Sequence, residues 1–228
     1  MVHKKVDNRI RVMIENGIKL GHRTMFVVVG DKAKDQVVIL HHMLSKAQVK
    51  ARPSVLWCYK KELDFSNHRK KKMKSLQKKI KHGKFDTNED DPFELFVAST
   101  SIRYCYYKET HKVLGNTYGM VVLQDFEALT PNLLARTIET VEGGIIGINQ
   151  SFENKILFQS FSPVLGGVIA LLLKSVNSLK QLFTMTMDVH ARYRTEAHGH
   201  VVGRFNERFI LSLANNKRCV VLDDSLNM

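Results

Sequence analysis

A glycine followed by charged residues, Gly30 to Val37, stands where a nucleotide-binding loop would leave a strand and open a helix. Such a P-loop uses glycines to bring the backbone close to phosphates, a lysine for the β- and γ-phosphates, and a Ser or Thr hydroxyl for Mg²⁺. Counted from Gly30, the required Gly, Lys and Ser/Thr positions hold Asp35, Gln36 and Val37. The sequence therefore predicts a degenerate, non-hydrolysing relative of an NTPase site, or a plain turn.

Acidic residues follow a second apolar run, because Val121 to Glu127 reads as a strand that ends at Asp125. This is the pattern of a strand that carries a metal-binding acid. An NTP site needs both halves, however, and the first half lacks its phosphate-binding residues.

The histidines do not indicate a metal site or a catalytic site. His41 and His42 lack a matching pair of metal ligands, and His190 with Glu196 lies in the kind of mixed polar run that is common in loops. We therefore predict no catalytic residue, no cofactor-binding residue and no metal ligand in this chain.

Positive charge concentrates in residues 60–84, here called the basic segment, which holds eleven Lys and Arg against two acids. Met73, Leu76 and Ile80 recur at helical spacing, which predicts a basic helix over residues 68–82 with lysines on its exposed side. Lysines without interleaved aromatic rings attract phosphates but do not recognise bases. The side chains predicted to contact RNA are Arg69, Lys70, Lys71, Lys74, Lys78 and Lys81.

Two other interpretations of the basic segment remain open, a nuclear-localisation signal and a solvated surface. The acidic run 86–94 follows directly and would neutralise part of the charge.

Composition is typical of a soluble globular domain, with 44% hydrophobic and 25% charged residues, but the formal net charge is +13. This imbalance favours a polyanionic partner. No apolar run reaches the roughly 18 residues needed to span a bilayer. Three dispersed cysteines in apolar surroundings predict reduced, buried thiols in an intracellular protein, with neither a disulfide framework nor a zinc site.

Six apolar runs read as strands, at residues 25–29, 54–59, 102–107, 120–123, 168–173 and 219–222. Helical spacing predicts helices over 36–48, 131–143 and 201–213, and a short helix that ends at Gly115. Strands that are apolar on both faces and alternate with helices indicate a mainly parallel sheet covered on both sides. We expect a single α/β domain over residues 1–228 that resembles a degenerate P-loop NTPase domain; the strand order is not predicted.

Long runs of the sequence resemble the eukaryotic RNA cytidine acetyltransferases, and the resemblance covers nearly the whole chain. It rests on residues 4–17, 26–47, 50–63, 124–144, 187–198 and 201–213.

The resemblance implies a nucleolar family of enzymes that make N4-acetylcytidine in ribosomal RNA and some tRNAs, using acetyl-CoA and ATP with Mg²⁺. It also implies RNA and ribosome-biogenesis proteins as partners, homodimerisation through the full-length family, and no membrane. In that family a helicase-like ATPase module and an acetyltransferase module follow the region seen here. Neither module's motif occurs before Met228, so we expect this chain to bind neither cofactor and to be inactive alone.

A second departure from the family is an insert at residues 145–166, whose only charges are Glu153 and Lys155. Glycine pairs flank it, and we expect it to come from a splice variant or a gene-model artefact. The leading hypothesis is an accessory module of the acetyltransferase. The alternatives are a freestanding RNA- or RNP-binding protein, including a truncated competitor of the full enzyme, and an autonomous nucleotide hydrolase.

Overall fold

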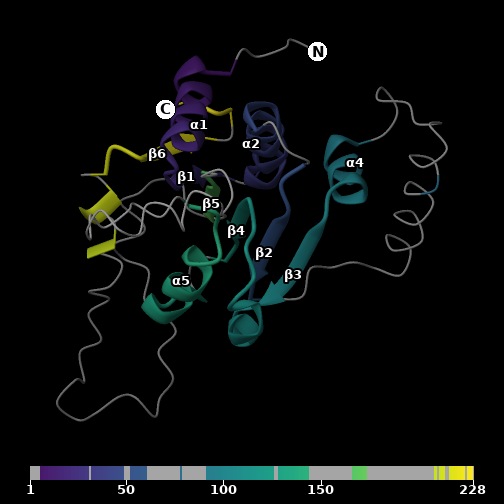
Figure 1. The fold of residues 1–228 in the computed structure, drawn as a ribbon, viewed down its shortest axis with the longest axis vertical. Helices are drawn as coiled ribbons and strands as arrows, with labels where there is room; N and C mark the ends of the chain where they lie inside the picture. The colour runs from purple at the N-terminus through teal and green to yellow at the C-terminus, as the bar shows by residue number, and fades with distance from the viewer. Residues whose placement is uncertain are drawn as a thin grey trace, which may run out of the picture.

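The computed structural model describes residues 6–30, 32–48, 52–60, 78, 91–125, 128–143, 166–173, 208–209, 211–213, 216–223 and 225–227 (Figure 1). Six strands form one sheet in the order β3-β2-β4-β5-β1-β6, and every pair is parallel. The strands are β1 (Thr24–Val29), β2 (Val55–Tyr59), β3 (Ile102–Tyr106), β4 (Met120–Leu123), β5 (Val168–Leu173) and β6 (Cys219–Asp223). The predicted α/β class and all six strands are confirmed.

The inner strands are buried on both faces, as their apolar sequences predict. Every residue of β2, β4 and β5 is buried, whereas β3 and β6, at the two ends of the strand order, are partly exposed. Strand β1 pairs with β5 on one side and β6 on the other, so the first strand of the chain joins the last two. Strand β5 in turn pairs with β4, which links β1 to the rest of the sheet.

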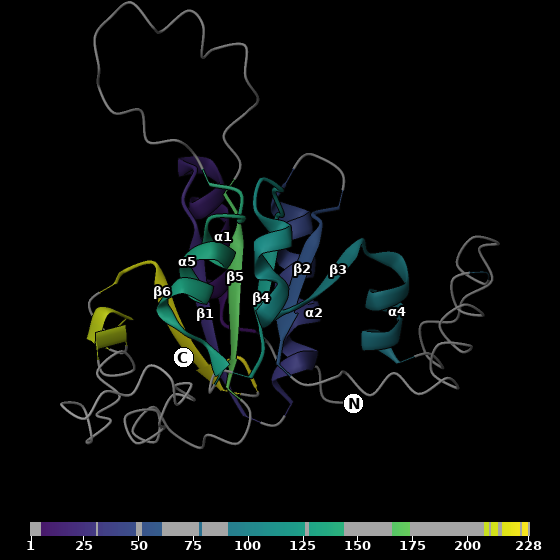
Figure 2. The same ribbon diagram turned by 90° about the horizontal axis from the view of Figure 1, so that it is seen from below.

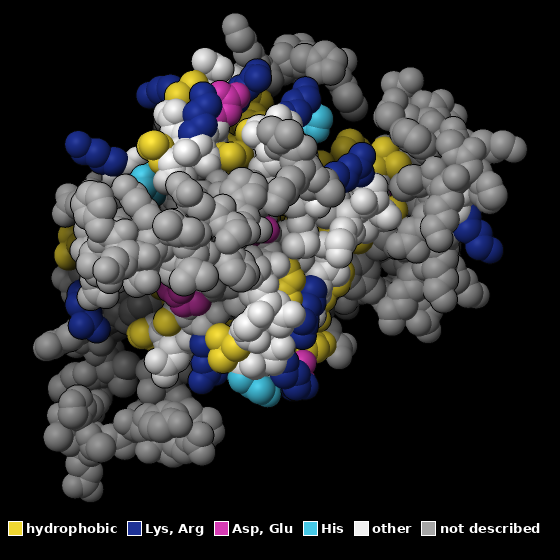
Figure 3. Space-filling view, viewed as in Figure 1, with side chains coloured by type: hydrophobic (Ala, Val, Ile, Leu, Met, Phe, Trp, Pro, Cys, Tyr) yellow, Lys and Arg dark blue, Asp and Glu magenta, His cyan; other side chains and the backbone are white. Residues whose placement is uncertain are grey.

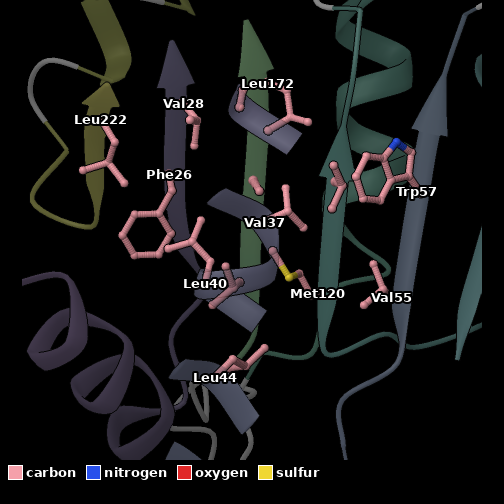
Figure 4. Close-up of a cluster of buried hydrophobic side chains, with 14 of the residues drawn as sticks. Phe26, Val28, Val37, Leu40, Leu44, Val55, Trp57, Met120, Leu172 and Leu222 are labelled. Atoms are coloured by element: carbon pink, nitrogen blue, oxygen red, sulfur yellow. The ribbon is translucent and has the colours of Figure 1, made fainter. Parts of the chain in front are cut away.

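Helices cover both faces of the sheet, which confirms the predicted layers (Figure 2). The first face packs against α1 (Asn8–Leu20), α2 (Ala33–Ala47) and α4 (Pro92–Ser99). The second face packs against the 3₁₀ helix η1 (Tyr107–Val113) and α5 (Pro131–Ile138). Figure 4 shows the first core, in which Val37 and Leu40 of α2 lie over Phe26 and Val28 of β1.

Helices α1 and α4 were absent from our sequence prediction, although both carry start signals. The Asp7 carboxylate accepts a hydrogen bond from Arg9 N at 2.9 Å, and Gly21 ends α1 in the left-handed conformation. Asp91 caps α4 in the same way, and Pro92 occupies its first turn, where a missing N–H costs nothing. Charged residues dilute the apolar stripe of α1, and α4 has eight residues, so neither shows strong periodicity.

The other predicted helices are confirmed with changed ends. Helix α2 begins at Ala33, three residues before the predicted start, and α5 ends at Ile138 rather than at Gly143. After α5 the chain turns so that Val141 forms a parallel bridge with Tyr118. Within the predicted helix 201–213, the described residues 208–209 and 211–213 are helical.

The two flanks of the insert lie close together at the amino ends of β4 and β5. A Cβ atom built on Gly167 would lie 2.7 Å from Glu142 O and 2.4 Å from Val141 Cγ1. The Gly167 carbonyl accepts from Thr24 N at 3.1 Å, and Arg23 Nε donates to Val141 O at 3.0 Å. The fold therefore holds both flanks in place on either side of residues 144–165, which lie outside the described residues.

Removal of residues 145–166 is therefore expected to leave the fold intact. The deletion joins Gly144 to Gly167, so a four-residue turn from Glu142 closes the gap and Gly144 takes the place of Gly166. The shorter loop should raise the free energy of unfolding by about 1–2 kcal/mol, because less entropy is lost on closure. Urea denaturation measures this change.

A chain in which a Gly/Ser segment of equal length replaces the insert serves as the control, and it should match the parent chain. Loss of cooperative unfolding in the deletion chain would show that the insert is part of the core.

Candidate nucleic-acid interface

The position of the predicted phosphate loop does not have the shape of a P-loop. Gly30 follows β1 with its N–H bonded to Leu173 O at 3.1 Å, and α2 begins at Ala33, so three residues separate strand from helix. The residue before α2, Lys32, makes no side-chain cap, and Gln36 and Val37 are buried against the sheet. Backbone N–H groups in this short turn cannot surround a phosphate as a glycine-rich loop does. The resemblance to P-loop NTPase domains thus stays a prediction.

Asp125, which follows a strand as a metal-binding acid would, has a structural role. Its backbone adopts the left-handed conformation (φ 58°), and its carboxylate accepts a hydrogen bond from Lys60 N at 2.9 Å. The neighbouring Gln124 accepts from Trp57 Nε1 at 3.1 Å, and its carbonyl accepts from the Tyr107 hydroxyl. These bonds tie the carboxyl ends of β2 and β4 together. Among the described residues no cluster of His, Cys, Asp or Glu could hold a metal ion.

The carboxyl ends of β2 and β4 form the switch point of the sheet. The connection after β2 contains α4 on the first face, whereas the connection after β4 contains α5 on the second. In open α/β sheets, ligands bind at the crevice where neighbouring connections diverge in this way. The basic segment begins here, because Lys60 is both its first residue and the residue whose N–H Asp125 holds.

The far side of the basic segment is also anchored, because Asp91 caps α4 and α4 packs on the sheet. Both ends of the sequence from Lys60 to Asp91 are therefore fixed to the sheet, and it carries eleven Lys and Arg against six acids, a net charge of +5 out of the chain's +13. Lys78 is the predicted RNA-binding residue that the structure describes, and it is exposed in a helical conformation. Arg69, Lys70, Lys71, Lys74, Lys81 and most of the predicted helix 68–82 lie outside the described residues, as do His190 and Glu196.

More positive charge lies along β3, which neighbours β2, and our sequence reading did not single it out. Arg103 donates to the Tyr118 hydroxyl at 3.3 Å and to Lys112 O at 3.1 Å. The ammonium of Lys108 lies 5.3 Å from the ring centre of Tyr106, and Lys112 pairs with Glu109 at 2.9 Å. Figure 3 shows Lys and Arg side chains recurring around the rim of the molecule. Two basic residues that flank three tyrosines, as in residues 103–108, are the sequence signal for this edge.

The buried side chain of His41 has a structural role in the core. His41 Nε2 donates to Pro53 O at 3.0 Å, and its ring meets Phe96 edge-on at 5.0 Å. Burial lowers the pKa of His41, so the ring is neutral and acts as a packing residue.

The three cysteines are free thiols, and Cys58 and Cys105 are buried, as predicted, whereas Cys219 is half-buried. Sequence spacing did not reveal that Cys58 and Cys105 face each other on paired strands. No described helix is long and apolar enough to cross a bilayer.

These features define an α/β domain with one parallel sheet, no P-loop geometry in its first strand-to-helix turn, and a basic segment that begins at its switch point. The family model described as "tRNA(Met) cytidine acetyltransferase TmcA, N-terminal" matches residues 1–149, and the chain belongs to this family. Three relatives called RNA cytidine acetyltransferase align with all of the chain, at 67% identity in Homo sapiens, 68% in Mus musculus and 55% in Saccharomyces cerevisiae. The chain spans about a fifth of the length of each, 20% in all three.

Proposed function

We propose that this chain is the non-catalytic, RNA-contacting N-terminal module of an enzyme that makes N4-acetylcytidine in ribosomal RNA and tRNA. Acetyl-CoA and ATP with Mg²⁺ would serve the enzyme elsewhere in the longer polypeptide, in the nucleolus during ribosome biogenesis. The relatives named RNA cytidine acetyltransferase support the enzyme class, since they align with the whole chain. The short β1–α2 turn and the engaged carboxylate of Asp125 support a role without nucleotide chemistry.

The observation that carries RNA contact is the placement of the basic segment. Its residues 60–84 contribute eleven of the chain's thirty-five Lys and Arg, and they begin at a residue held by a hydrogen bond at the switch point. The segment therefore leaves the sheet at a fixed point, the carboxyl end of β2, which is the neighbour of β3. Lysine side chains on a helix attract phosphates and release counterions, so the contact should be sensitive to salt.

RNA binding across a salt series tests this proposal directly. The log–log slope for the unaltered chain and single-stranded RNA is expected to be about −4, as for roughly six neutralised phosphates. The variant Lys70→Glu/Lys71→Glu/Lys74→Glu/Lys78→Glu should bind at least about tenfold more weakly and show a shallower slope.

The same four positions changed to Arg provide the matched control, because arginine keeps the charge. Full binding is expected from this control. Salt-insensitive binding, or equal affinity in the Glu variant, would contradict RNA contact and leave localisation or solubility as the role of the segment.

A further inference from the structure

A groove lies between α1 and the turn that precedes β6, at the amino ends of β1 and β6. Its volume is about 490 Å³. One wall comes from the outer side of α1, and the other from Lys217 and Arg218. Backbone hydrogen bonds fix that second wall, since Met25 N donates to Arg218 O at 2.9 Å and Arg218 N donates to Asn216 Oδ1 at 2.9 Å.

The α1 wall has an apolar stripe that is partly exposed, with Met13 also packed against the core. Ile10 and Ile14 turn inward to the sheet and are buried, whereas Val12, Met13 and Leu20 line the groove. Val12 is 44% exposed and Leu20 is 65% exposed, so both present apolar area to solvent. Val12 or Met13, Asn16 and Leu20 are three or four residues apart, so they lie on successive turns along one side of α1. Such a stripe is the form of surface that receives the apolar side of another helix.

Charge in the groove is one-sided. Among the described residues that line it there is no carboxylate, and the cations are Arg9, Lys217 and Arg218 beside His22. Asp7 compensates Arg9 directly, through an ion pair of 2.6 Å. Lys217 and Arg218 are exposed and remain the main positive charges, opposite the apolar stripe. The surface therefore has an apolar wall facing a positive wall.

We propose that this groove docks an acidic amphipathic helix of a protein partner. The apolar side of that helix would cover Val12, Met13 and Leu20, and its carboxylates would meet Lys217 and Arg218. The lining favours protein over RNA, because its described residues include no Phe, Tyr or Trp for base stacking and its exposed apolar side chains would stay uncovered under a phosphate backbone. The groove lies at the amino ends of β1 and β6 and the basic segment starts at the carboxyl end of β2, so this inference does not rest on the proposed RNA contact.

The probe is a displayed library of helical peptides, selected on the full chain and counter-selected on its Leu20→Glu variant. Selected peptides should carry apolar residues at i, i+3 or i+4, and i+7, with Asp or Glu grouped along one side. Their affinity, measured by fluorescence anisotropy, should fall about tenfold or more with Leu20→Glu, the loss typical of one central apolar anchor. Lys217→Glu/Arg218→Glu should also weaken binding and abolish its salt dependence.

Leu114→Glu is the matched control, since Leu114 is a 50% exposed leucine at the end of η1, away from the groove. It should leave peptide affinity unchanged. Selection of basic peptides, or no enrichment that depends on Leu20, would overturn the proposal. It would equally be overturned if Lys217→Glu/Arg218→Glu removed binding of single-stranded RNA while no acidic peptide was selected, which would mark the groove as a nucleic-acid surface.

Discussion

A chain that ends at residue 149 is expected to remain unfolded, although the family model matches residues 1–149. In the described sheet, β1 pairs with β5 and β6 alone, and β5 is the strand that connects β1 to β4. Without residues 168–173 and 219–223, the apolar strand β1 has no partner, and β4 loses its neighbour β5 and becomes an edge strand. The sheet would then be three strands, β3-β2-β4, with much of its apolar surface in water.

Far-UV circular dichroism and urea denaturation measure this effect. The unaltered chain should unfold cooperatively, whereas the 1–149 chain should show no cooperative transition. The chain lacking residues 145–166 is the informative control, because it keeps every strand and should unfold cooperatively. A cooperative transition in the 1–149 chain would mean that β1 can find another position in the sheet.

The Gly166→Ala substitution is expected to destabilise the fold by about 3 kcal/mol or more, at the upper end of what overpacking costs. A Cβ atom at this position would lie 2.3 Å from Gly17 O, 2.5 Å from Gly17 C and 2.8 Å from His22 O. All three are backbone atoms of α1 and the turn after it, so no side chain can move aside. Relief would require α1 to shift away from the sheet, together with the buried Ile10 and Ile14.

Gly115→Ala provides the comparison, since the two substitutions add the same methyl group. Gly115 has a positive φ of 81° but nothing within 4 Å of a built Cβ, so its cost is limited to about 1 kcal/mol of backbone strain. Urea midpoints of the two variants, measured against the parent chain, separate crowding from backbone strain. Equal costs for the two variants would show that α1 yields easily at Gly166.

The strands were predictable because each is a short apolar run, and their length and their β-branched or aromatic residues favour a strand over a buried helix. Their order was not predictable. The position of β1 between β5 and β6 depends on helix α2 crossing over two strands that are made later in the chain. Hydrophobic pattern gives no information on such crossings, which are set by packing between distant elements.

The positive charge of the candidate site could be predicted from the sequence, but the hydrogen bond that fixes the start of the basic segment could not. Lysine density alone identified the basic segment, because no partner is needed to count charges. The structural role of Asp125 could not be predicted, since an acid that follows a strand shows its role only when the neighbouring strand is known. Only the pairing of β2 with β4 brings Lys60 N within reach of that carboxylate. The groove between α1 and the turn before β6 could not be predicted, because α1 itself was not predicted.

Trp57 gives this domain a built-in optical reporter, since it is the only tryptophan in the chain. Its side chain is 1% exposed in the middle of β2, and the Tyr104 ring centre lies 6.4 Å away, within range of efficient energy transfer. Tryptophan fluorescence, excited directly or by energy transfer from Tyr104, therefore reports on one buried position in the sheet. The indole N–H donates a hydrogen bond to Gln124, which is next to Asp125, and Asp125 in turn binds Lys60 N. A ligand that displaces the basic segment should therefore change the tryptophan emission without any added dye.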